Sequence, residues 1–356
     1  MPRSPRLSDS PFDVLAARDP VAAFFEAHER GGLVKLGTSG TLVAPRSVVR
    51  TTHSWWASFP TVTRLLSMDS SSRVWVPGPM SSTMNLFAAV HARSVGARVV
   101  TGPEFATHSH LTPSALSRTL KAGPDLRGMH VVVAGDLLSR KLSARATAAG
   151  MRISHYYGAA ELSFVAWGSH EADLRPLPEV EISVREDVVW VRSPFLCQGY
   201  DGAPDDAPSD QPSDQPSDQP GAMRTDDDGF ATVGDRGSYS DGRLIVGGRG
   251  TAAVTTGGAT VHVADVEHVL RSVTDDEVIV LGLPHAGLGE VVAAVLADPA
   301  AFPRARDTAR SALASAQRPR LWFTVAEPPL TVAGKVDRAA LAQLLDPPGT
   351  GVRRLS

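Results

Sequence analysis

A glycine-rich segment near the amino terminus has the composition of an anion-binding loop. Residues 37–41 read GTSGT, and Pro45 and Arg46 follow. Glycine and small hydroxyl residues let the backbone curl so that its N–H groups converge on an anion, while hydroxyls and one cation hold phosphate oxygens. The segment is not a Walker A loop, because GxxxxGK[ST] is missing. Taken alone, it fits an ordinary turn better than a phosphate site.

Three further segments place aromatic, acidic or basic side chains beside glycine. Residues 156–161 read YYGAAE, where an aromatic face could receive a base and a carboxylate could hold Mg²⁺. Residues 228–235 read DGFATVGD, and an ionised Asp can accept hydrogen bonds from both hydroxyls of a ribose. Residues 331–338 read TVAGKVDR, where Lys335 could meet developing negative charge. Each segment also fits an ordinary structural role: a strand end, a hairpin turn (expected at Asp241-Gly242) or a solvated surface lysine.

Hydrophobic patterning predicts the framework that must position these segments. Short apolar runs predict strands, and apolar residues at helical spacing predict helices. Strands that alternate with helices favour an α/β fold, a largely parallel sheet with helices on its faces. We expect strands within 34–41, 73–79, 98–100, 130–136 and 152–158, and helices within 20–28, 49–66, 84–97 and 139–149.

From about residue 179 the pattern changes to short alternating strands separated by turns. This pattern predicts an antiparallel sheet with strands within 180–187, 188–194 and 242–250. Residues 201–222 contain three copies of Ser-Asp-Gln-Pro and no apolar anchors, so we expect a disordered surface loop there.

The carboxy-terminal segment predicts a small α+β unit. Its helices fall within 263–273 and 306–316, and its strands within 278–284 and 290–297. The glycine-rich stretch GGRG at 247–250 is the natural boundary. The 356 residues therefore divide into an expected large domain, 1–247, and a small domain, 248–356.

Charge and cysteine content bound the class of protein. A net charge of −3 and a pI near 6.4 give no basic footprint for nucleic acid or an anionic membrane surface. Cys197 is the only cysteine, so no internal disulfide can form, which fits a reducing compartment. The amino terminus lacks the apolar core of a signal peptide, and no apolar run is long enough to span a bilayer. We expect a cytoplasmic protein.

The order of the four segments resembles the adenylate-forming (AMP-binding) superfamily, which comprises acyl-CoA synthetases, peptide-synthetase adenylation domains and luciferases. The resemblance covers residues 34–341, and the segments 187–200 and 258–267 also match. It implies a large α/β domain of mainly parallel sheets with an antiparallel β subdomain, and a small mobile α+β lid. It also implies ATP-dependent activation of a carboxylic acid with Mg²⁺, followed by thioester formation with coenzyme A. The chain begins about where the phosphate loop occurs, as in short members such as some succinylbenzoate–CoA ligases.

The resemblance also implies roles for individual residues. Thr38, Ser39, Gly40 and Thr41 would form the phosphate loop, with Arg46 where the family usually has Lys. Ala134, Gly135 and Asp136 would line the adenine and acyl pocket, and Tyr157, beside Gly158, would stack on adenine. Glu161 would bind Mg²⁺, Asp235 would hold the ribose with Arg249 beside it, and Lys335 would bridge carboxylate and phosphate. The small domain would rotate about residues 249–252.

Several positions depart from the family pattern. Leu42 and Val43 replace a Thr-Gly pair, Ala160 replaces a Thr, Thr251 replaces the hinge acid, and Met80 stands at a position that often carries His. These departures keep open a degenerate module that binds an acyl or nucleotide ligand without turnover. The acceptor could also be a carrier-protein thiol or an amine in place of coenzyme A, and the acid could be succinylbenzoate.

Several further positions have mainly structural interpretations. We interpret His91 as structural, and His108 and His110 as members of a Thr/Ser-rich loop without the additional ligands that a metal site needs. Trp55 and Trp56 fit the core or a pocket wall better than a recognition platform. Asp136 could instead cap the following helix, and we favour that cap over a contact with a polar substrate group.

Overall fold

The computed structural model describes residues 10–37, 46–202, 222–249, 253–274 and 276–356, without the side chain of Arg249. Several predictions therefore lie outside the described residues. They concern the phosphate-loop residues Thr38, Ser39, Gly40 and Thr41, the replacements Leu42 and Val43, positions 203–221 of the predicted loop, and Thr251 at the predicted hinge.

A seven-stranded sheet in the order β10-β9-β8-β7-β6-β4-β5 confirms the predicted parallel sheet. Strands β5, β4, β6, β7 and β8 run parallel, while β9 and β10 form an antiparallel edge. The strands are β4 (Arg73–Trp75), β5 (Arg98–Val100), β6 (His108–Leu111), β7 (His130–Val133), β8 (Arg152–Ala159), β9 (Ser163–Gly168) and β10 (Arg175–Pro176).

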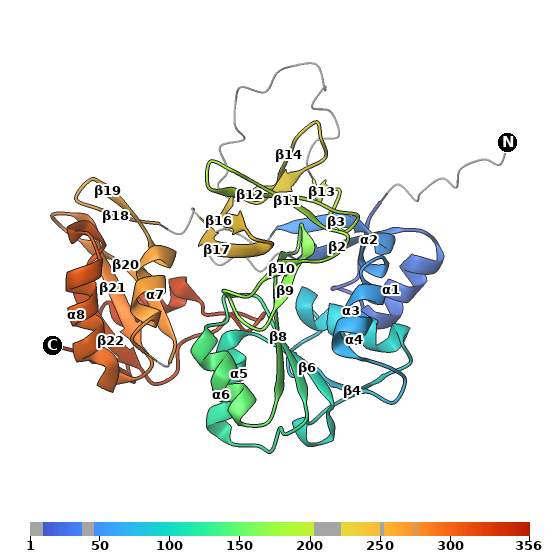
Figure 1. The fold of residues 1–356 in the computed structure, drawn as a ribbon, viewed down its shortest axis with the longest axis horizontal. Coiled ribbons are helices and arrows are strands. Elements are labelled where there is room, and N and C mark those ends of the chain that lie inside the picture. Colours follow the sequence, from blue (N-terminus) through green and yellow to red (C-terminus); the bar gives the residue numbers. More distant parts are fainter. Residues whose placement is uncertain (1–9, 38–45, 203–221, 250–252, 275) are drawn as a thin grey trace.

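Helices connect successive parallel strands and cover the sheet (Figure 1). They are α4 (Thr83–Ser94), α5 (Pro113–Ala122) and α6 (Arg140–Ala148). Thr112 and Ser139 begin α5 and α6, because each side-chain oxygen accepts the N–H three residues on, at 3.1 Å. The assignment of Asp136 as the cap of α6 is therefore wrong; its carboxylate accepts the N–H of Leu137 at 2.7 Å instead.

The single helical pattern predicted over 49–66 is wrong, because the segment divides into three elements. They are β3 (Ser47–Thr51), α2 (Thr52–Trp56) and α3 (Phe59–Leu66). Thr51 ends the strand and caps α2, accepting the N–H of Ser54 at 3.1 Å. Pro60 lacks an N–H and suits the first turn of a helix, so a new helix begins there. Trp55 lies in the core, 3% exposed, as predicted.

The predicted loop at His108 and His110 is also wrong. Both residues lie in β6, and both are buried together with His91, His130 and His155. Ring nitrogens of His108 and His155 lie 3.0 and 2.9 Å from the backbone oxygens of Leu66 and Val133. Among the described residues, no group of three or more His, Cys, Asp or Glu side chains could hold a metal ion.

These histidines predict acid sensitivity. Burial lowers the pKa of His91, His130 and His155 to about 4 and that of His110 to about 3. Because the unfolded chain protonates first, near pH 6.5, the stabilisation is complete above that pH and is lost as the pH falls toward 4. We expect the free energy of unfolding to fall by up to about 1.4 kcal/mol per pH unit for each histidine, in urea titrations between pH 7 and 5.

His110→Leu provides the control, since neither ring nitrogen of His110 has a hydrogen-bond partner in the described structure. This variant should unfold with a shallower pH dependence than the wild-type chain. An unchanged slope would contradict the assignment of the acid sensitivity to these side chains.

Two smaller sheets lie against the parallel sheet and share its core. One, in the order β1-β2-β3-β13, contains β1 (Phe12–Asp13), β2 (Leu33–Gly37) and β13 (Gly199–Tyr200), next to α1 (Pro20–Glu29). The other confirms the predicted antiparallel region: β14 (Arg224–Thr225), β15 (Ala231–Thr232), β12 (Val188–Arg192), β16 (Asp235–Ser240) and β17 (Arg243–Arg249), with β11 (Glu181–Arg185) on β12. Asp241 and Gly242 form the predicted hairpin turn, with φ of 51° and 69°.

The carboxy-terminal residues form a separate α+β sheet in the order β19-β18-β21-β22-β23, with β20 on β21. Its strands are β18 (Ala253–Thr256), β19 (Ala259–His262), β20 (Val278–His285), β21 (Gly289–Leu296), β22 (Leu321–Val325) and β23 (Val352–Arg354). Helices α7 (Val263–Arg271) and α8 (Phe302–Ala312) contribute to one apolar cluster. Helix α9 (Arg338–Leu345) packs in a second cluster with residues of β20, β21 and β22. Helix α8 begins four residues before the predicted helix at 306–316, with Pro303 in its first turn.

In Figure 1 the carboxy-terminal sheet lies beside the seven-stranded sheet, with α5 and α6 on the side nearer to it. Ser114 and Arg145, from these two helices, contact Glu277 and Asp276 across the junction. No helix among the described residues has the length and apolarity needed to cross a bilayer.

Candidate functional site

The hairpin of β8 and β9 carries the first group of predicted site residues. Strand β8 runs one residue past the strand predicted at 152–158, to Ala159, with a register shift between Tyr157 and Gly158. A Cβ atom at Gly158 would lie 2.0 Å from the backbone oxygen of Ser163, so only glycine fits this close approach. The irregular hairpin places Tyr157 and Glu161 at the carboxyl end of β8, the edge where ligands bind in open α/β sheets.

Tyr157 and Asp235 are joined directly. The Tyr157 hydroxyl donates to Oδ2 of Asp235 at 2.7 Å, and both side chains are buried. Asp235 begins β16, where its backbone pairs with that of Arg249. The structure therefore brings together the aromatic ring, the acid and the backbone of Arg249, which the sequence places up to 92 residues apart.

Glu161 and Arg46 meet through a residue that sequence reasoning gave no separate role. Glu161 is 3% exposed and accepts a hydrogen bond from the Tyr200 hydroxyl at 2.9 Å. The guanidinium carbon of Arg46 lies 5.5 Å from the centre of the Tyr200 ring. Burial, and then the neighbouring Glu161 carboxylate, raise the pKa of Tyr200 to about 12, so the phenol stays a donor. The Gly-Tyr pair at 199–200 was the available signal for this residue.

A fully buried arginine supports the same hairpin. Nη2 of Arg50 donates to the backbone oxygens of Ala160 at 3.2 Å and Phe195 at 3.0 Å. Burial lowers its pKa to about 10, and the Glu161 carboxylate acts in the opposite direction. Its Nε and Nη1 have no hydrogen-bond partner in the described structure. No sequence signal marked this position, since arginine side chains usually face solvent.

Arg50→Met is expected to lower the free energy of unfolding by about 2–4 kcal/mol, because it leaves two buried carbonyls and the Glu161 carboxylate without their cation. Urea denaturation measures this loss. Arg64→Met is the comparison, since Arg64 is an exposed residue of α3 and should change stability by less than about 0.5 kcal/mol. Equal effects of the two substitutions would contradict the role assigned to Arg50.

Lys335 reaches the carboxyl end of the parallel sheet from the other end of the chain. It lies in a tight turn in which the Gly334 N–H donates to the Thr331 oxygen and the Thr331 N–H donates to the Lys335 oxygen, both at 2.8 Å. Gly135, just after β7, has φ +87°, and a Cβ atom there would lie 2.9 Å from Cε of Lys335. The lysine stem therefore lies directly against Gly135, and a side chain at 135 would displace it.

The ends of the predicted phosphate loop lie close together. Gly37 ends β2 and pairs with Ser47 of β3, so residues 38–45 connect two adjacent strands. Oγ1 of Thr83, at the start of α4, donates to the Gly37 oxygen at 2.8 Å. Gly37 therefore lies beside the amino terminus of α4, a position that suits an anion.

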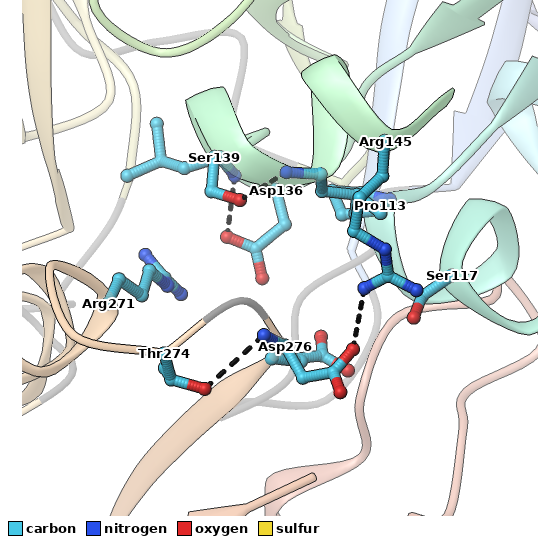
Figure 2. Close-up of a pocket in the computed structure, with 11 residues that line it drawn as sticks. Pro113, Ser117, Asp136, Ser139, Arg145, Arg271, Thr274 and Asp276 are labelled. Carbon is cyan, nitrogen blue, oxygen red and sulfur yellow. Dashed lines mark hydrogen bonds and ion pairs between the residues drawn. The ribbon is translucent and has the colours of Figure 1, made fainter. Parts of the chain in front are cut away.

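A cavity of about 30 Å³ lies between the carboxy-terminal sheet and helices α5 and α6 (Figure 2). Asp136, Arg145 and Arg271 line it, together with Asp276 and Glu277. It has room for a water molecule rather than an organic acid. Arg145 Nη1 lies 2.7 Å from Oδ1 of Asp276 across it. The cavity belongs to a polar junction between two parts of the chain, and Tyr157, Glu161 and Asp235 do not line it.

Comparisons with known proteins show which proteins this chain is similar to. No protein-family model matches the chain. An uncharacterised acyl–CoA ligase of Bacillus subtilis is 24% identical over 96% of this chain and 72% of its own length. The chain is similar to acyl-CoA ligases, in agreement with the resemblance that its motifs predicted.

Solved structures of adenylate-forming enzymes share the fold of this chain, which confirms the predicted fold class. ATP-bound MatB from Rhodopseudomonas palustris superposes with a TM-score of 0.70 at 22% identity, over 87% of this chain and 67% of that one. The o-succinylbenzoate CoA synthetase MenE from Bacillus subtilis, in complex with the acyl-adenylate intermediate OSB-AMP, gives a TM-score of 0.65 at 20% identity, over 86% and 68%. The chain spans about two thirds of the length of these ligases.

Proposed function

We propose that this chain activates a carboxylic acid with ATP and transfers the acyl group to coenzyme A. In the first step a carboxylate oxygen attacks the α-phosphorus of ATP, and the bond to pyrophosphate breaks. In the second the thiol sulfur attacks the acyl carbon, the bond to AMP breaks, and the thiol proton is released. The contact of Lys335 with Gly135, on the sheet edge that also carries Tyr157 and Glu161, is the observation that carries this proposal.

The residues divide between nucleotide binding and charge stabilisation. Tyr157 would offer its ring to adenine, and Asp235, whose carboxylate is oriented by the Tyr157 hydroxyl, would accept the ribose hydroxyls. Lys335 would place a cation on the oxygens that gain negative charge as the carboxylate attacks. Gly135 leaves space for the lysine stem, as its close approach requires.

Magnesium fits this site only together with the nucleotide. Mg²⁺ is usually held by one or two carboxylates plus substrate phosphates, and Glu161 is a single buried carboxylate at the sheet edge. In the described part of the chain no cluster of acidic or histidine ligands offers a second site. When bound, the metal would neutralise charge on the phosphates. Tyr200 and Arg50 would orient the Glu161 carboxylate and its hairpin.

The acceptor is tested by product analysis. Purified protein is incubated with ATP, Mg²⁺, a panel of acids and either coenzyme A, a carrier-protein thiol or an amine. The proposal expects AMP, pyrophosphate and an acyl-CoA thioester in equal amounts. Formation of a thioester only on the carrier protein, or of an amide, would reassign the acceptor while leaving adenylation intact. Because ATP and coenzyme A are intracellular metabolites, a cytoplasmic location accompanies this proposal, as the single cysteine also suggests.

A further inference from the structure

The turn that carries Lys335 is fastened to the start of α5 by one side chain. Oγ1 of Thr112 donates to the backbone oxygen of Gly334 at 2.7 Å. Oγ1 of Thr112 also accepts the N–H of Ala115 at 3.1 Å and so caps the start of α5. Because the cap uses a lone pair of the hydroxyl, its single proton is available for the Gly334 carbonyl. Thr112 is 2% exposed, so this bond is shielded from water.

The geometry around Thr112 also fits the lysine stem. A Cβ atom at Gly135 would lie 3.5 Å from Cγ2 of Thr112 and 2.9 Å from Cε of Lys335. The threonine thus contacts the turn with its hydroxyl, and its methyl group lies at the same glycine that the lysine stem crosses. Thr112 therefore holds the backbone just before Lys335 and also lies beside the lysine side chain.

Two polar contacts nearby join the same parts of the chain. Oγ of Ser114, two residues after Thr112, donates to Oε1 of Glu277 at 2.7 Å. Arg145 and Asp276 form the ion pair seen in Figure 2. Burial raises the pKa of Glu277. Of these three contacts, that of Thr112 is the one that reaches the turn that holds the lysine.

We propose that Thr112 is a positioning residue for adenylation: it holds the 331–335 turn so that Lys335 lies over Gly135. This inference rests on the proposed function, in which only the adenylation step uses Lys335. A displacement of about 1 Å in a catalytic group can cost on the order of 100-fold in rate, and a flexible lysine on an unfastened turn would be displaced at least that far. Loss of the Thr112 hydroxyl should therefore slow adenylation and spare attack of the thiol on a preformed acyl-adenylate.

The test compares three variants of the full chain. Thr112→Val removes the hydroxyl and keeps the methyl group, and Thr112→Ser keeps the hydroxyl. Thr51→Val is the matched control, because Thr51 caps α2 through an equivalent bond to Ser54 and lies on a different element. We expect Thr112→Val to lower the turnover rate of acid-dependent ATP–pyrophosphate exchange about 10- to 100-fold. Its KM for ATP and its rate of thioester formation from supplied acyl-adenylate should stay within about threefold of wild type.

Thr112→Ser should restore exchange, and Thr51→Val should leave both half-reactions unchanged. Equal loss of both half-reactions in Thr112→Val, or full exchange in that variant, would overturn the proposal. Thermal unfolding accompanies each assay, so that loss of the helix cap is measured separately.

Tryptic cleavage after Lys335 gives a readout that needs no activity. Thr112→Val should accelerate this cleavage relative to Thr51→Val, because the turn is no longer fastened. The wild-type protein could show no exchange with any acid while Thr112→Val still accelerated cleavage. That result would support the contact of Thr112 with the 331–335 turn and contradict the proposed function. Unchanged cleavage after Lys335 would overturn the role of Thr112 whatever the activity.

Discussion

Lys335→Ala is expected to lower the rate of acid-dependent ATP–pyrophosphate exchange by at least about 100-fold. Removing one preorganised donor that meets developing charge costs on the order of 100- to 1,000-fold in turnover, and a full cation removed from a partly buried turn belongs at the upper end. The KM for ATP should change little, since binding falls to other residues. Initial-rate measurements at saturating ATP and acid give the turnover rate directly.

Lys121→Ala is the matched control for this substitution. Lys121 lies in the last turn of α5 and is exposed, so its loss removes the same side chain from a solvated position. It should leave exchange within about twofold of wild type, as expected for a surface substitution. If Lys335→Ala exchanged at the wild-type rate, Lys335 would have no part in adenylation.

Asp235→Ala is expected to raise the KM for ATP by at least about 100-fold. Hydrogen bonds to a charged group contribute about 1.5–3 kcal/mol each, and the proposed site would lose two of them from the ribose. The substitution also leaves the buried Tyr157 hydroxyl without the acceptor seen at 2.7 Å. Substrate-saturation curves for ATP, with equilibrium binding of ATP as a second measurement, give the size of the effect.

Tyr157→Phe separates the two consequences of losing Asp235. It keeps the ring for stacking and removes only the hydroxyl that orients the carboxylate, so the KM for ATP should rise by less than about tenfold. A rise as large as that of Asp235→Ala would mean that the carboxylate acts through Tyr157 rather than on the nucleotide. An unchanged KM in Asp235→Ala would remove the ribose role altogether.

Much of the fold followed from local patterns in the sequence. The runs of valine in β7 and β21 predict strands because both faces of those strands are buried. Asp241-Gly242 predicts its turn because both residues must adopt positive φ. The order of glycine-rich motifs predicted the similarity to acyl-CoA ligases, although no single motif did.

Elements whose limits depend on tertiary contacts were harder to predict. The region 49–66 has apolar residues at helical spacing, yet pairing of β3 with β2 and β13 overrides that pattern at its start. His108 and His110 were assigned to a loop because their segment is rich in threonine and serine, which are usually exposed, whereas a parallel strand buries both faces.

The candidate site was predicted only in part for a similar reason. Tyr157, Asp235 and Lys335 were named from motif order, and the structure places each of them at the same sheet edge or against it. Arg50, Thr112 and Tyr200 were missed, because their partners lie far along the chain, 222 residues away in the case of Thr112 and Gly334. For Thr112, the pair Thr-Pro marks a helix start, but nothing local reveals the second bond of its hydroxyl.

Exchange of labelled pyrophosphate into ATP tests the central claim most directly. The wild-type protein is assayed with Mg²⁺ and without any acceptor, against aliphatic, aromatic, amino and succinylbenzoate acids. Adenylation by this chain predicts exchange that requires both Mg²⁺ and one class of acid, and that Lys335→Ala abolishes. Binding of ATP without exchange for every acid would contradict the claim and favour a module that holds its ligand without turnover.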